Sequence, residues 1–313
     1  MGELTVNDRE KRDTYRIPWA EGVAMIATTL LCWLWLGGGC SRWLSLLYRD
    51  GQPWLESFMI SVAVIFSPFL CMGLGIWISL AYIIRMPLCR FTTDAPRFRW
   101  KLAIVPLVIT FLSYGGFEAI GYLGHPDRYI LKFTSDWVPR LISLPLLLIL
   151  IPFQTSCEEL LFRCLPARLF YGKLPKAWGK RFILCLLSVL LFIVPHLANP
   201  DLTASEKPYA VLTYYALFGG LAMASALLTG GFEMALGIHA ANNLFISLIC
   251  GYPHSPLPGI PLMTNLRTLD GWTSCVQLLA TFAITGLVLY SGRNKLFGYK
   301  EAPGYKEAPG QRI

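Results

Sequence analysis

Charged residues are scarce in this chain of 313 residues. Asp, Glu, Lys and Arg make up 15 % of it, hydrophobic residues make up 55 %, and the mean hydropathy is +0.51. A soluble globular domain contains about 25 % charged residues, so this composition excludes that class. The sequence therefore predicts an integral membrane protein.

A Cys-x-x-Cys pair is also missing from the sequence. The nine cysteines are odd in number and most of them lie inside apolar runs. Cysteines in such positions act as small buried hydrophobic residues, which argues against a disulfide framework or a zinc knuckle.

Long apolar runs dominate what is present. A hydrocarbon core of about 30 Å requires about 20 helical residues. Eight runs have roughly this length or more: 18–38, 57–84, 102–124, 138–168, 181–198, 208–230, 231–250 and 271–291. We therefore expect an all-α, polytopic membrane protein with about eight transmembrane helices.

The expected organisation is one membrane domain with two polar ends. Residues 1–17 form a charged N-terminal segment, residues 18–292 the membrane domain, and residues 293–313 a tail in which GYKEAP occurs twice. The tail has too little apolar surface to fold alone, so we expect it to be disordered. The first apolar run lacks a small-residue cleavage site, so we expect it to be retained.

The net charge of +8 follows from how Lys and Arg are placed between the runs. Counted over alternate connections, 20 of these residues fall on one side and 7 on the other. Cytoplasmic connections carry the excess of Lys and Arg, so both termini should be cytoplasmic, and we expect the plasma (inner) membrane. The same pattern accounts for the basic charge without nucleic acid as a partner.

The fourth run ends in an acidic motif, TSCEELLFRC, although buried charges are costly in a membrane. Glu159 and Arg163 are four residues apart, so they share a helical face and are expected to form an ion pair. Glu158 is turned about 100° away and is left without that partner.

Two histidines and an asparagine lie in later runs. His196 follows Pro195 near the end of the fifth run, and His239 lies four residues before Asn243 in the seventh. Asn242 points away from the face shared by His239 and Asn243, so we expect it to lie outside the site. The helical rise places Glu158 and His196 at one level, about 20 Å from the nearest cytoplasmic charges. His239 and Asn243 lie about 12 and 18 Å beyond Gly231, which is compatible with a cluster reached from the cytoplasmic side.

Prolines near these polar residues free backbone carbonyls, which indicates that the polar side chains line a cavity. A carboxylate, two imidazoles and an amide at one depth supply a base, a proton carrier and oxyanion donors, the groups that hydrolysis requires.

Three motifs in order resemble the CAAX prenyl protease and bacteriocin-processing (CPBP, or Abi) family of intramembrane proteases. They are EELLFR at 158–163, FIVPH at 192–196 and HAANN at 239–243. The resemblance covers about residues 153–245 and implies an eight-span fold that hydrolyses peptide bonds in membrane-associated peptides or proteins. It also implies that Glu158 and His196 activate water and that His239 and Asn243 stabilise the oxyanion. Glu159 and Arg163 would hold the site.

Two alternatives use the same residues differently. Glu158, His196 and His239 are also suitable ligands for Zn²⁺, although no His-Glu-x-x-His spacing is present; otherwise we expect no cofactor. A transporter or non-catalytic membrane binding protein would use buried Glu and His to carry protons or hold an ion. Lipid bilayer and a membrane-associated peptide or protein substrate are the expected partners, and the sequence leaves the oligomeric state open.

Overall fold

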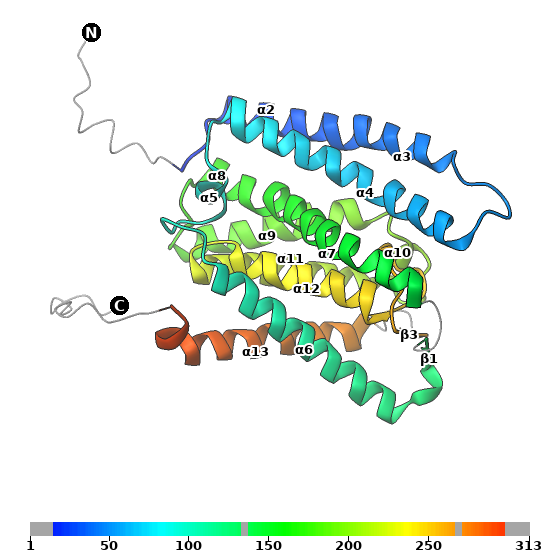
Figure 1. Ribbon diagram of the computed structural model, residues 1–313. Coiled ribbons are helices and arrows are strands. Elements are labelled where there is room, and N and C mark those ends of the chain that lie inside the picture. Colours follow the sequence, from blue (N-terminus) through cyan, green and yellow to red (C-terminus); the bar gives the residue numbers. More distant parts are fainter. Residues whose placement is uncertain (1–14, 133–136, 267–270, 298–313) are drawn as a thin grey trace, which may run out of the picture.

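Helices account for most of the chain in a computed structural model that describes residues 15–132, 137–266 and 271–297. The helical elements are α2 (Trp19–Leu30), η1 (Leu31–Gly37), α3 (Gly38–Ser45), α4 (Trp54–Ile78), η2 (Ser79–Ile83), α5 (Leu88–Thr92), α6 (Trp100–Gly124), η3 (Pro126–Arg128), α7 (Trp137–Glu159), η4 (Leu160–Cys164), α8 (Leu165–Phe170), α9 (Trp178–His196), α10 (Pro200–Thr203), α11 (Pro208–Thr229), α12 (Glu233–Leu248) and α13 (Gly271–Phe297). The strands are β1 (Tyr129–Leu131), β2 (Cys250–Gly251) and β3 (Met263–Asn265). The all-α prediction is confirmed (Figure 1).

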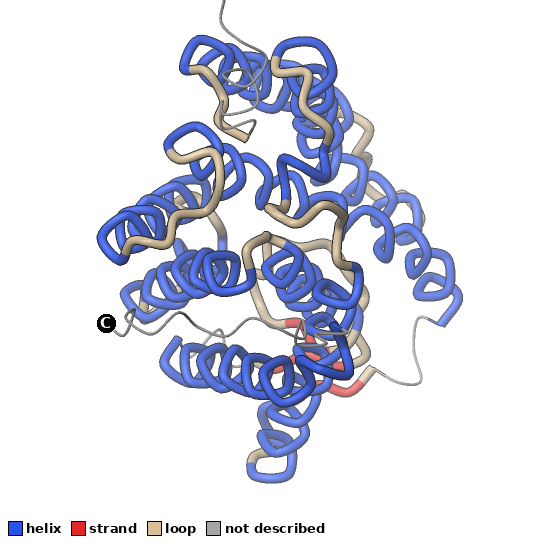
Figure 2. Tube along the Cα trace, turned by 90° about the vertical axis from the view of Figure 1, so that its left-hand side faces the viewer, coloured by secondary structure: helices blue, strands red, loops and turns tan. Residues whose placement is uncertain are grey.

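Seven helical segments in the described part of the chain are long and apolar enough to cross a membrane. They match seven of the eight predicted runs. The remaining run, 231–250, forms the shorter helix α12, whose 16 residues reach about 24 Å at 1.5 Å per residue. Viewed along the helix axes, the helices make one bundle and the strands occupy one small region (Figure 2).

Helix α12 is buried among its neighbours rather than exposed to lipid. Its side chains are nearly all buried, and its most extensive contacts are with α6 and α7. Gly237 makes the closest approach: a Cβ at this position would collide with the carbonyl group of Ala103 on α6. A glycine is therefore needed here for the two helices to pack.

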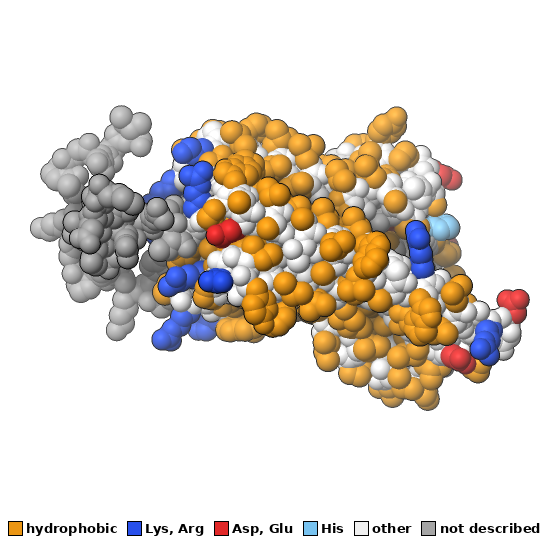
Figure 3. Space-filling model, turned by 90° about the horizontal axis from the view of Figure 1, so that it is seen from above, with side chains coloured by type: hydrophobic (Ala, Val, Ile, Leu, Met, Phe, Trp, Pro, Cys, Tyr) orange, Lys and Arg blue, Asp and Glu red, His pale blue; other side chains and the backbone are white. Residues whose placement is uncertain are grey.

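The outer surface of the bundle is apolar between two polar ends, as expected for contact with lipid (Figure 3). Trp35, Leu112, Ile149 and Leu287 are among its large exposed side chains. The protein is thus an integral, multi-pass membrane protein.

The two ends of the bundle differ in charge. The start of α2 and the end of α13 lie at the same end (Figure 1), and Lys and Arg side chains gather there (Figure 3). At this end Arg99 donates two hydrogen bonds to Glu233, from Nε at 2.8 Å and from Nη2 at 2.7 Å, which fixes the start of α12. We call this end the basic end.

A small sheet that the sequence did not predict closes the opposite end. Strand β3 lies between the other two, antiparallel to β1 and parallel to β2. Arg140, at the start of α7, donates a hydrogen bond from Nε to the carbonyl of Ile260 at 3.0 Å and so ties α7 to the segment that precedes β3. We call this end the sheet end.

The described helices can be set beside the predicted domain limits. Helix α2 begins at Trp19, close to the expected start at 18, but α13 continues to Phe297, into the expected tail 293–313. The rest of that tail and most of the segment 1–17 lie outside the described residues.

Candidate active site

Glu159 and Arg163 form the predicted ion pair across one turn of η4. Both side chains are completely buried. Arg163 also donates a hydrogen bond from Nε to Ser188 on α9 at 3.1 Å, and its guanidinium lies 4.6 Å from the ring of Phe192. The pair therefore joins the end of α7 to α9. The π-helical turn η4 begins directly after Glu159 and contains Arg163, and such turns are frequent at functional sites.

His239 of α12 connects the two glutamates. Its Nδ1 lies 2.8 Å from Glu159 Oε1, and its Nε2 lies 3.5 Å from Glu158 Oε2. Because Arg163 balances one carboxylate, a single proton shared by Glu158 and His239 makes this buried group of four neutral. Such a group is far less costly to bury than one with a net charge.

A chain of side-chain amides leads away from Glu158. Gln154 donates to Glu158 Oε1 at 2.5 Å and accepts from Asn243 at 3.2 Å. Asn242 donates to Asn243 Oδ1 at 2.9 Å and accepts from the hydroxyl groups of Tyr214 and Tyr114 at 2.8 and 3.0 Å. The expectation that Asn242 lies outside the site is wrong, because neighbours on a helix can still bond through their side-chain ends.

His196 lies at the end of α9, apart from the glutamates. Its Nδ1 lies 2.6 Å from the carbonyl oxygen of Phe192, and its ring is 4.6 Å from that of Tyr215. A carbonyl oxygen only accepts, so Nδ1 must carry a proton, and Nε2 of the neutral ring is left as an acceptor.

One cavity of about 220 Å³ brings the predicted residues together. Glu158, His196, His239 and Asn243 all line it, whereas Glu159 and Arg163 lie behind its wall. The expected common depth of Glu158 and His196 agrees with this arrangement. The cavity extends to Asn199, Asp201, Tyr252, Pro256 and Leu257 in the loops of the sheet end. These residues lie at the end opposite the one that bears the termini.

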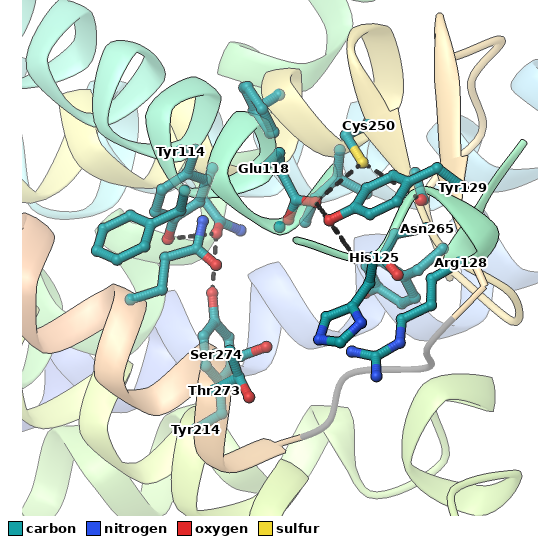
Figure 4. Close-up of a pocket in the computed structure, with 18 residues that line it drawn as sticks. Tyr114, Glu118, His125, Arg128, Tyr129, Tyr214, Cys250, Asn265, Thr273 and Ser274 are labelled. Carbon is teal, nitrogen blue, oxygen red and sulfur yellow. Dashed lines mark hydrogen bonds between the residues drawn. The ribbon is translucent and has the colours of Figure 1, made fainter. Parts of the chain in front are cut away.

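A second cavity of about 190 Å³ shares Tyr214 and Asn242 with the first (Figure 4). Inside it, Glu118 accepts hydrogen bonds from Tyr129 at 2.9 Å and from Asn265 at 3.2 Å, and the Cys250 thiol lies 3.5 Å away. Burial, reinforced by Glu118, raises the pKa of Cys250 and of Tyr129. A thiol held protonated in this way is a poor nucleophile, so Cys250 does not suit cysteine-protease chemistry.

The zinc alternative finds little support in the positions of the donors. No group of three or more His, Cys, Asp or Glu side chains within the described ranges is spaced to hold a metal ion. Both nitrogens of His239 face carboxylates, and His196 has one nitrogen on a backbone carbonyl.

Sequence reasoning missed four participants. Gln154 lies four residues before Glu158, a spacing that signals a shared helical face. Tyr114 and Tyr214 gave no signal, because aromatic residues in apolar runs are ordinarily read as packing. Asp201, which lines the cavity, follows the fifth run in the sequence NPD and belongs to none of the three motifs.

Fold and site together define an all-helical, multi-pass membrane protein with a buried glutamate, histidine and asparagine site. The sequence model for the family "Type II CAAX prenyl endopeptidase Rce1-like" matches residues 139–245, which contain all three motifs. "Uncharacterized protein YyaK" of Bacillus subtilis (strain 168) is 30 % identical over 218 residues, which are 69 % of this chain and 70 % of that protein. The chain belongs to the Rce1-like family of CAAX-type intramembrane proteases, as its motifs indicated. No solved structure matches it.

Proposed function

We propose that this protein is a glutamate-dependent intramembrane endopeptidase in which Glu158 is the base. The observation that carries the proposal is the state of its carboxylate. Oε1 is fixed by Gln154, whereas Oε2 is buried in the cavity wall without a hydrogen bond in the described structure and lies 3.5 Å from His239 Nε2. A carboxylate with one oxygen fixed by a hydrogen bond and the other free to accept a proton suits the activation of a water nucleophile.

In the proposed reaction, Glu158 takes a proton from water as the water oxygen attacks the scissile carbonyl carbon. His196 Nε2, the free acceptor of its ring, binds the same water. The C–N bond then breaks, and the leaving amine receives the proton from Glu158 or from the imidazole. No acyl-enzyme forms, because the nucleophile is water.

Asn243 and His239 are assigned to the oxyanion that forms on the carbonyl oxygen. The Asn243 amide has its orientation fixed by Asn242, and one of its two N–H groups bonds to Gln154, so the other is available. His239 is held by Glu159 through Nδ1, which directs Nε2 into the cavity. Donors that are oriented in advance act mainly in the transition state.

The proposed substrate is a membrane-associated peptide or protein, with a prenylated C-terminus or a leader peptide as the candidates. Apolar and aromatic side chains also line the cavity, among them Trp33, Phe66, Phe69 and Phe162. This lining suits the apolar part of such a substrate. We place the protein in the plasma (inner) membrane with both termini cytoplasmic, since Lys and Arg gather at the basic end.

The test compares native protein with Glu158→Gln on farnesylated CAAX peptides in detergent and on the membrane proteome of cells that carry each form. Gln retains the side-chain volume and removes the base, so turnover should fall by about 10²-fold to 10⁴-fold while folding is unchanged. A precursor should accumulate in the variant cells.

Glu56→Gln is the matched control, because Glu56 is an exposed carboxylate in the first turn of α4. It should leave turnover unchanged. Near-native cleavage by Glu158→Gln would remove Glu158 as the base. Stoichiometric zinc in purified protein, with activity lost on chelation, would favour the metal alternative.

A further inference from the structure

The cavity is lined by acidic side chains. Among the described residues that line it, Glu158 and Asp201 are acidic, His196 and His239 are imidazoles, and none is Lys or Arg. A pocket of this kind with apolar walls concentrates positive charge.

Asp201 is the residue whose partners are incomplete. It lies in α10 at the sheet end and is 1 % exposed. Oδ2 accepts hydrogen bonds from Tyr215 at 2.7 Å and from Tyr252 at 3.2 Å, whereas Oδ1 is buried without a hydrogen bond in the described structure. Burial raises the pKa of Asp201, and the two tyrosines offset part of this effect. A buried carboxylate in this state is costly unless something binds it.

Asp201 is close to the proposed reaction centre. The ring of Tyr215 lies 4.6 Å from that of His196, tilted by 44°, and its hydroxyl donates to Asp201 and accepts from Asn199 at 3.1 Å. One tyrosine ring therefore separates Asp201 from His196. Extended peptide covers that separation in about two residues, at about 3.3–3.6 Å each.

We propose that Asp201 is a specificity-determining residue that binds a positively charged group of the substrate. The group is the protonated amine or guanidinium of a basic side chain, or a free amino terminus, within about two residues of the scissile bond. This assignment rests on the proposed function. A favourable substrate then combines an apolar portion against Trp33 and Phe69 with a cation against Asp201.

Binding tests the assignment independently of cleavage. The probes are fluorescent farnesylated CAAX peptides with Lys, Gln or Glu next to the prenylated Cys, on either side. They are titrated against full-length Glu158→Gln protein in detergent. A charge-assisted hydrogen bond should make the Lys peptide bind about tenfold or more tighter than the Gln peptide, and the Glu peptide should bind weakest.

Adding Asp201→Asn should reduce the Lys preference to less than about twofold, because the amide oxygen still accepts from the tyrosines but carries no charge. Asp201→Glu should retain the preference. Asp127→Asn removes an exposed carboxylate at the same end, in η3, and should change nothing.

Equal binding of the Lys and Gln peptides, a preference that survives Asp201→Asn, or no binding by any peptide would overturn the assignment. If the Lys preference depends on Asp201 but the native protein cleaves none of the peptides, the cation site is supported and the peptidase proposal is refuted. The same peptides with an acetylated amino terminus show whether Asp201 binds the side-chain cation or the terminal amine, because acetylation removes only the charge of the terminus.

Discussion

Glu158 and Glu159 are neighbours in the chain, yet their carboxylates have different partners. Glu159 is held by Arg163 and by His239, while Glu158 bonds to the Gln154 amide and faces the cavity. The first carries an ion pair and does not line the cavity, whereas the second has no arginine partner and lines it. Single substitutions should therefore separate stability from chemistry.

Glu159→Gln should destabilise the protein, because it leaves Arg163 buried and unpaired. Removing one partner of a buried ion pair costs about 3–5 kcal/mol. Thermal unfolding in one detergent measures the change. The double variant Glu159→Gln, Arg163→Met should recover part of the stability without activity. A single variant as stable as the native protein would contradict this reading.

Asn243→Ala should lower kcat by about 10²-fold to 10³-fold, as the loss of one oxyanion donor does in other hydrolases. His239→Ala should also act on the chemical step. Asn242→Ala should cost less, about tenfold, because Asn242 is expected to act on the oxyanion only through Asn243. Single-turnover cleavage gives the order of the variants.

Ser247→Ala provides the control for this series. Ser247 lies one turn beyond Asn243 on α12, is buried, and has no hydrogen bond from its hydroxyl in the described structure. The Ser247→Ala variant should cleave substrate at the native rate. A larger loss at Asn242 than at Asn243 would mean that the oxyanion role is assigned to the wrong amide.

At the scale of elements, α12 positions the site because it packs closely against α6. Three of the site's side chains lie on this short helix, and its depth in the bundle places them against α7. The close contact depends on Gly237, two residues before His239.

Gly237→Ala should lower the unfolding temperature, because the added Cβ pushes α12 away from Ala103. Overpacking of this kind costs about 1–3 kcal/mol. Turnover should fall as well, since His239 moves with the helix. Gly116→Ala on α6 is the control: a Cβ there meets no other atom within 4 Å, so it should be neutral or slightly stabilising. Equal effects at both positions would refute the packing argument.

At the scale of the whole molecule, the basic end and the sheet end should face opposite sides of the membrane. Topology reporters fused after Arg293 and inserted near His254 should therefore give opposite signals, with the first cytoplasmic. The cavity then extends toward the non-cytoplasmic side, because its outer residues belong to the loops of the sheet end. Two signals from the same side would contradict both the predicted topology and the side toward which the cavity extends.

The sequence by itself determined the class of fold and the ion pair beside the candidate site. Hydropathy is a local property of the chain, so runs of about 20 apolar residues could be counted without knowing how they pack. The spacing of Glu159 and Arg163 likewise predicted their ion pair, because one helical turn brings such residues together wherever the helix lies.

Only the tertiary structure decided what those residues touch. The bond from Asn242 to Asn243, the approach of His239 to both glutamates and the two tyrosines on Asp201 depend on the rotation and depth of separate helices. The end toward which the cavity extends was decided in the same way, by loops at residues 199–203 and 252–262 that are distant in the sequence. Contacts of this kind are set by packing between elements, and no periodicity within one element encodes them.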